Sequence, residues 1–298
     1  RHMLRRLPLH HGLFLAAALA GAHGPAGCNG DDGCGSCEAP TAAGALANPD
    51  LKETSGIATS ATHDGVFYAH NDAGDSARFF GFSRDGADLG TYKVKGADNV
   101  DWEDMAQGPC DAGSCVYLGD IGDNTGVRIA YTLYRVPEPT TVGPGEQSLP
   151  GDRIVFTYPN GANDAETLLV HPTTGVVTII TKSSGAATIF ELVPPLTIDK
   201  THMAREAGEV EPPGGGKFTG GAIHPDGTAV VLRTTKGLLY YAMSPDQSAV
   251  AALAGAPCTL PAVAETNGEA VTWLQGGAGI MTIGEGAGAQ IHVATCDG

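Results

Sequence analysis

Three glutamates recur at one position of a repeated pattern and are the first candidates for chemistry. Five short stretches begin with a small or acidic residue followed by small or apolar ones, and they start at Ser55, Glu103, Glu166, Thr219 and Glu269. Successive starts lie 48, 63, 53 and 50 residues apart. If the repeats fold alike, the carboxylates converge, and carboxylates that converge in a desolvated place stay ionised only beside a cation.

A second set of polar residues follows these starts at a similar spacing, such as the 15 residues from Ser55 to His70. Carboxylate oxygens suit Ca²⁺, which takes roughly six to eight oxygen ligands. The alternative is that these are ordinary turn residues, because Asp and Asn side chains bond their own backbone in turns. We predict a calcium-type site at one face, with these candidate ligands: Glu103, Glu166, Glu269, Asp72 and Asp120.

Other side chains near these positions are candidates for binding or catalysis. Lys182 and Arg233 occupy one position in adjacent repeats and could hold a phosphate or carboxylate group beside a metal, or could instead pair with neighbouring acids. Trp102 is a candidate for stacking on a ligand, or for packing beneath the loop. No GxSxG nucleophile motif occurs, so a hydrolase would need a metal-activated water with His70 or Glu103 as its base.

The elements that must position these residues are short strands. Each start is followed by strand-length runs bounded by turn residues, the chain holds 43 Gly and 19 Pro, and no segment keeps a helical period of useful length. Repeats of this length with four strands each predict an all-β β-propeller. We expect five blades, although a sixth could lie within 137–163. The last repeat lacks a fourth strand, which residues 46–52 ("LANPDLK") could supply, so that an N-terminal strand closes the ring.

The first 28 residues have the composition of a targeting segment. Arg5 and Arg6 precede the apolar run "GLFLAAALAGA", which is too short to span a bilayer, and "GPAGC" ends at Cys28 like a lipoprotein cleavage box. We therefore expect export, with a lipid anchor on Cys28, or otherwise a periplasmic or secreted protein. Residues 29–45 are expected to form a flexible linker, and residues 46–298 the propeller domain.

Seven cysteines leave six for disulfides if Cys28 carries lipid. Cys110 and Cys115 bracket a tight loop and are predicted to be bonded. Cys258 and Cys296 flank the last repeat and are predicted to be bonded as well. Two cysteines remain, which either bridge each other or belong to a disordered tether: Cys34 and Cys37.

The net charge of −16 limits the classes of partner. Nucleic acids and anionic membrane surfaces are repelled by such a chain. We expect the partner to be a small molecule or a protein, contact with a membrane only through the lipid anchor, and a monomer.

Long parts of the chain resemble a known group of proteins. The stretch from Thr62 to Pro109, which contains "DWED", together with "VYLGDIGDN" and "LYRVPEP", resembles exported bacterial β-propeller proteins over residues 50–295. More distantly, the blade starts are similar to those of phytase-like and esterase-like propellers. That resemblance implies Ca²⁺ binding and, in some members, hydrolysis of phosphoesters or esters. The regucalcin and gluconolactonase propellers also carry a metal in the channel, but they have six blades.

Three classes of function follow from these patterns. The first is an exported propeller whose acidic site binds a ligand or a partner, and this is our main prediction. The second is a metal-dependent hydrolase of phosphate or carboxyl esters. The third is a structural protein of the cell envelope.

Overall fold

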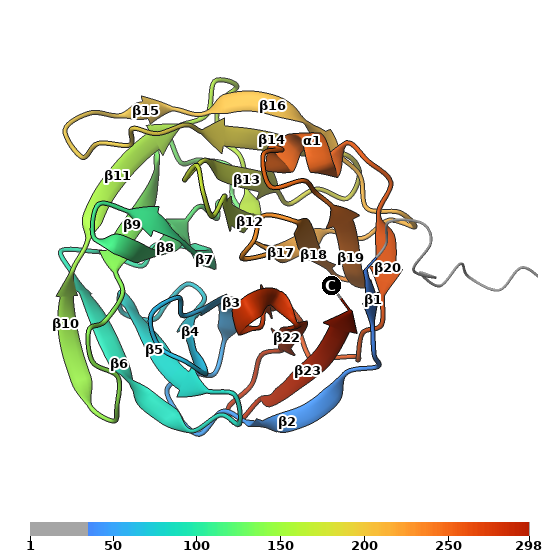
Figure 1. Ribbon diagram of the computed structural model, residues 1–298. Helices are drawn as coiled ribbons and strands as arrows, with labels where there is room; N and C mark the ends of the chain where they lie inside the picture. The colour runs from blue at the N-terminus through green and yellow to red at the C-terminus, as the bar shows by residue number, and fades with distance from the viewer. Residues whose placement is uncertain (1–34, 298) are drawn as a thin grey trace, which may run out of the picture.

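The protein is a ring of five small β-sheets around a central axis (Figure 1). The structure is a computed structural model and describes residues 35–297. The predicted all-β propeller with five blades is confirmed, and the sixth blade considered for 137–163 does not exist. Within the described residues the only helices are α1 (Ala249–Leu253) and the single 3₁₀ turn η1 (Gln275–Gly277).

Each blade is a meander that runs outward from the axis. From inside to outside, blade 1 consists of β3 (Thr54–Thr59), β4 (Val66–Asn71), β5 (Arg78–Ser83) and β6 (Asp88–Lys95). Blade 2 consists of β7 (Trp102–Cys110), β8 (Gly113–Asp120), β9 (Tyr131–Pro137) and β11 (Asp152–Thr157). Blade 3 consists of β12 (Ala165–Val170), β13 (Val177–Thr181), β14 (Ala187–Leu192) and β16 (Arg205–Val210). Blade 4 consists of β17 (Phe218–Ile223), β18 (Ala229–Thr234), β19 (Gly237–Ala242) and β20 (Cys258–Leu260).

Blade 5 joins the two ends of the described chain. Its strands β21 (Ala270–Trp273), β22 (Gly279–Ile283) and β23 (Gln290–Asp297) are completed by β2 (Thr41–Ala45), which pairs antiparallel with β23. The predicted closure by an N-terminal strand is confirmed. However, the strand lies just before the expected 46–52 and inside the range 29–45 predicted as a linker, so the linker prediction is wrong for residues 41–45. The small side chains of β2 are mostly exposed and gave no apolar pattern to detect.

Two additional strands connect neighbouring blades at the rim. The chain leaves β9 to add β10 (Glu146–Pro150) in parallel to the outer strand β6 of blade 1, and only then returns as β11. In the same way β15 (His202–Met203) pairs with β11 of blade 2 before the chain enters β16. The stretch considered for a sixth blade is therefore one such connection.

Every interface between neighbouring blades holds its own apolar cluster. The cluster between blades 1 and 2 contains Tyr68, Tyr92 and Trp102, and all three side chains are 0% exposed. Burying one large apolar side chain stabilises the fold by about 1.5–3 kcal/mol. Five such interfaces hold the ring rigid, so the inner strands place their first residues at fixed positions around the axis.

The disulfides confirm one predicted pair and correct the other. Cys110 is bonded to Cys115 as predicted, but Cys296 is bonded to Cys37 rather than to Cys258. This bond holds β1 (Ser36–Cys37) against β23 and excludes a bridge between Cys34 and Cys37. Cys258 is itself disulfide-bonded.

The remaining predictions for the N-terminal part cannot be compared with the fold. The targeting segment 1–28, the lipid on Cys28, and Cys34 lie outside the described residues. Among residues 35–297, no helix is long and apolar enough to cross a membrane.

Candidate site at the channel mouth

The recurrent first residue of each repeat has a backbone explanation. In blades 1 to 4 the pairing of the inner strand shifts by one residue there; for example, Trp102 faces Asp120 and Asp104 faces Gly119, which leaves Glu103 unpaired. Such a bulge redirects one side chain away from the normal alternation. In blade 5 the equivalent Glu269 immediately precedes β21. The five residues therefore surround the mouth at which the inner strands begin.

Two of these residues connect blades through their hydroxyl groups. Ser55 Oγ donates to the backbone carbonyl of Glu103 in the next blade, and Thr219 Oγ1 donates to the carbonyl of Gly268, 3.2 Å away, before blade 5. Where the position carries glutamate, the side chain is free for other contacts. The repeat is thus partly structural and partly available for ligands.

One glutamate of the set belongs to a compact acidic cluster, which we call the acidic triad: Asp72, Asp101 and Glu103. One carboxylate oxygen from each of the three residues lies within 4.8 Å of the other two. Gly122, in the loop after β8, makes room for them, because a Cβ there would lie 2.2 Å from Glu103 Oε1 and 2.5 Å from Asp101 Oδ2. The triad has the oxygen donors that a hard divalent cation prefers.

The triad differs from the predicted set of ligands. Asp101 was not predicted as a ligand; it immediately precedes β7. Asp120 was predicted but forms an ion pair with Arg128, with 2.7 Å between Oδ1 and Nη1. Glu166 is paired with Lys182. Of the five predicted ligands, the structure brings Glu103 and Asp72 together in the triad.

Repulsion and burial strongly perturb these carboxyl groups. Burial, followed by the charges of Asp72 and Asp101, raises the pKa of Glu103 to about 10. Burial and the charge of Asp72 raise the pKa of Asp101 to about 6. Burial and the charges of Glu285 and Asp72 raise the pKa of Glu269 to about 7. Without a cation, Glu103 is therefore protonated at neutral pH.

The raised pKa values predict how the stability of the metal-free protein depends on pH. The folded state keeps protons on Asp101, Glu269 and Glu103 at pH values where the unfolded chain has lost them, so the free energy of unfolding falls as pH rises. We expect the Tm in chelator to be lower at pH 8 than at pH 5.5, measured by scanning calorimetry. Glu103→Gln should reduce this difference in Tm. If the Tm of the wild type in chelator is equal or higher at pH 8, the pKa values of these carboxyl groups are not raised by folding.

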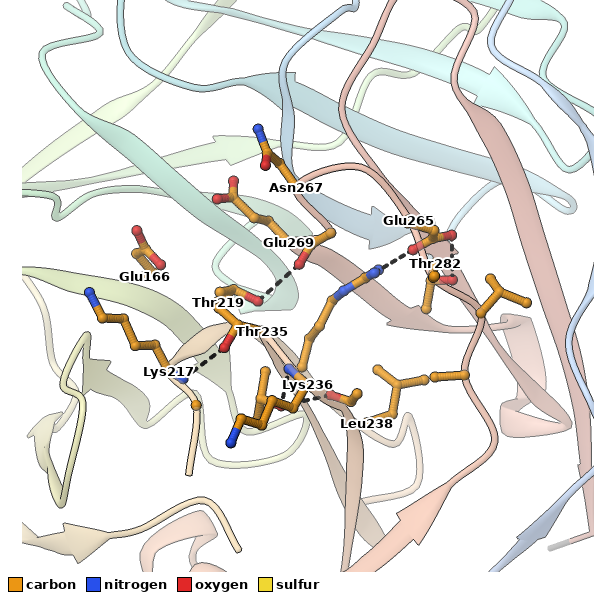
Figure 2. Close-up of a pocket in the computed structure, with 18 of the residues that line it drawn as sticks. Glu166, Lys217, Thr219, Thr235, Lys236, Leu238, Glu265, Asn267, Glu269 and Thr282 are labelled. Carbon is orange, nitrogen blue, oxygen red and sulfur yellow. Dashed lines mark hydrogen bonds and ion pairs between the residues drawn. The ribbon is translucent and has the colours of Figure 1, made fainter. Parts of the chain in front are cut away.

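A cavity of about 890 Å³ opens between blades 3, 4 and 5 (Figure 2). Glu166 and Glu269 line its side nearest the axis, and each keeps one buried carboxylate oxygen, Oε2, without a hydrogen-bond partner. Lys217 also lines the cavity, and its side chain extends toward Glu166 (Figure 2). The cavity is thus polar and carries both signs of charge.

The two cations predicted to bind a ligand line this cavity but are paired with acids. Lys182 forms an ion pair with Glu166. Arg233 donates to Glu265 and, at 3.0 Å, to the carbonyl of Ala270. These contacts support the alternative considered from the sequence, that Lys182 and Arg233 neutralise neighbouring carboxylates.

Two other predicted site residues lie behind the channel wall. His70 and Trp102 are both 0% exposed and meet edge to face, with 5.5 Å between their ring centroids. Trp102 Nε1 donates to the carbonyl of Asp98, and burial lowers the pKa of His70. His70 is therefore not placed to act as a base at the mouth, and Trp102 is a packing residue that cannot stack on a ligand.

Below the mouth, one carboxyl group closes the channel. Asp104 is fully buried and accepts hydrogen bonds from its own strand at Met105 N, from blade 3 at Leu168 N and from blade 4 at Gly221 N, at 2.8, 2.9 and 3.3 Å. Burial raises its pKa, against the effect of the three N–H donors. At the neighbouring inner-strand position in blade 4, a Cβ on Gly220 would lie 2.4 Å from the carbonyl oxygen of Glu269, so glycine there lets the chain pass close to blade 5. Asp104 thus spans the axis and links three blades.

No protein-family model matches the chain, and no curated protein matches it either.

Proposed function

We propose that the protein binds a divalent cation of the calcium type at the acidic triad and, next to it, an anionic ligand in the cavity at the mouth. The observation that carries this proposal is the approach of Asp72, Asp101 and Glu103 to within 4.8 Å, with Glu103 only 3% exposed. A cation at this point would relieve their repulsion and lower the pKa of Glu103.

The adjoining cavity suits a ligand with phosphate or carboxylate groups. Lys217 is its most available cation, because Lys182 and Arg233 are paired with carboxylates and Lys236 Nζ donates to the carbonyl of Gly214. A metal ion bound at the triad would add positive charge near Glu269, which lines the cavity and interacts with the charge of Asp72. An anionic group in the cavity would then be attracted by both positive charges.

A second candidate, a metal-dependent hydrolase of phosphate or carboxyl esters, is favoured by one observation. Glu269 lies at the mouth beside the charge of Asp72, and its pKa is raised to about 7. A general base works best with a pKa near the operating pH. With water activated by a metal ion at the triad, Glu269 would be the base, in place of the buried His70.

Export belongs to the same proposal. Disulfides persist in oxidising compartments, and the Cys37–Cys296 and Cys110–Cys115 bonds support such a location. The five-blade ring also fits the resemblance to exported bacterial propellers. We propose membership of that group, with attachment to the cell envelope through lipid on Cys28.

The test is thermal unfolding with and without Ca²⁺, Mg²⁺ and Mn²⁺ after chelator treatment. Binding to the folded state alone stabilises by about 2.7 kcal/mol at one hundred times Kd, which should raise the Tm by about 5 °C. Glu103→Gln should remove most of this increase, and isothermal titration should show weaker binding.

The matched control is Asp246→Asn, which removes a charge from an exposed loop far from the mouth and should leave the increase intact. If none of the three ions changes the Tm, the triad is an ordinary acidic turn and the proposal fails. Hydrolysis of 4-nitrophenyl phosphate or acetate that depends on the added ion and on Glu269 would favour the hydrolase.

A further inference from the structure

The face opposite the acidic mouth holds a second cavity, which we call the apolar funnel. Its volume is about 240 Å³, and all five blades contribute to its wall. Asp104 lies between this cavity and the acidic mouth, so the two are separate sites. The main wall residues come from the ends of the inner strands and the following turn: Ile57, Ala106, Val170, Ala222, Trp273 and Leu274.

Small side chains explain why space remains at this end. Counting from the bulge residue, the fourth position of the inner strand is Ala58 in blade 1, Ala106 in blade 2 and Ala222 in blade 4. Blade 3 carries the larger Leu169 at this position. Three alanines around one axis leave a cavity that larger residues would fill.

Several polar groups in the funnel wall already have partners. Thr59 Oγ1 donates to the carbonyl of Trp273, and Trp273 Nε1 donates to the carbonyl of Ala222 at 3.2 Å. Gln107 Nε2 donates to Ser114 Oγ at 2.8 Å, outside the wall. No charged residue belongs to the lining. A ligand in the funnel thus finds a wall that is more apolar than polar and carries no charge.

We propose that the apolar funnel binds a small neutral molecule with one or two apolar rings. A dry protein cavity of about 150 Å³ lined by aliphatic and aromatic side chains binds benzene, and the funnel is somewhat larger. A charged ligand would lose its hydration without gaining a partner. A volume of about 240 Å³ suits a free small molecule and not a protein surface.

The test compares benzene with benzoate, which has the same ring and one charge. The chain has two tryptophans, and Trp273 lines the funnel, whereas Trp102 is buried between blades 1 and 2. We expect benzene to change the tryptophan fluorescence and, at about ten times Kd, to raise the Tm by about 2–4 °C. Benzoate should do neither at the same concentration.

Variants localise the binding. Ala222→Leu should fill the funnel and abolish both responses, and Ala61→Phe at the exposed rim does the same without disturbing the interior. Ala87→Leu, in an exposed turn of blade 1, is the matched control and should respond like the wild type. Iodobenzene soaked into crystals should place its iodine in the funnel. The proposal is wrong if benzene gives no response, if benzoate binds equally well, or if both filled variants still bind benzene.

Discussion

Replacing Cys37 and Cys296 together by serine should lower the free energy of unfolding by about 5 kcal/mol. The two cysteines are 259 residues apart, and in the chain-entropy account the stabilisation by a disulfide grows with the length of the loop that it closes. This bond closes almost the whole ring. It also compensates for weak non-covalent closure, because β2 is short, mostly exposed and interrupted by a register shift between Ala42 and Gly44.

The matched comparison is the second disulfide. Cys110 and Cys115 are only 5 residues apart, so replacing both by serine should cost about 2 kcal/mol. Urea unfolding of the two double variants, with the other disulfides intact, measures the difference. If opening the ring costs no more than opening the small loop, blade 5 is held by its strand pairing and the disulfide is incidental.

The architecture could be predicted from the sequence because its main signal is local. The inner strands of blades 1 to 4 carry a bulge at a polar or small residue near their start, blade 5 has Glu269 just before its inner strand, and the apolar positions that follow are buried between blades. The starts from Ser55 to Glu269 therefore repeat in the sequence as they repeat in space. Because five such starts can be counted in the sequence, five blades could be predicted.

The parts that were missed depend on contacts between distant segments. Residues 146–150 form strand β10, but their pairing with blade 1 depends on the path of the loop before them. Likewise Cys37 meets Cys296 only after the ring has closed, so spacing along the chain favoured the wrong partner. Neither contact leaves a local pattern.

Of the five residues predicted as ligands, the structure brings Glu103 and Asp72 together with Asp101. Position in the repeat identified Glu103, but it could not show that Glu166 turns toward Lys182 or that Asp120 turns toward Arg128. The partners of these two carboxylates, Lys182 and Arg128, lie in loops that differ in length between blades. Asp101 joined the triad because Gly122 leaves space for its carboxylate, which is a contact between two loops.

Replacing Asp104 by alanine should destabilise the fold by about 3–5 kcal/mol, because it leaves three buried N–H groups without an acceptor and a void on the axis. Met105, Leu168 and Gly221 supply these groups from three different blades. Water cannot easily replace the carboxyl group, since Asp104 is 0% exposed. The loss should appear as a lower midpoint of urea unfolding with an unchanged m-value.

Asp104→Asn distinguishes the cost of the lost hydrogen bonds from the cost of the void, because it changes the hydrogen bonds and keeps the side-chain volume. The amide fills the same space, but one of its two polar atoms is now a donor facing a backbone N–H group, so the expected cost is smaller, about 1–3 kcal/mol. Because Asp104 lies below the mouth and outside the acidic triad, folded Asp104→Asn should still bind Ca²⁺ if the triad does. Loss of Ca²⁺ binding with unchanged stability would make Asp104 a ligand. An unchanged urea midpoint in Asp104→Ala would show that the ring closes without this axial link.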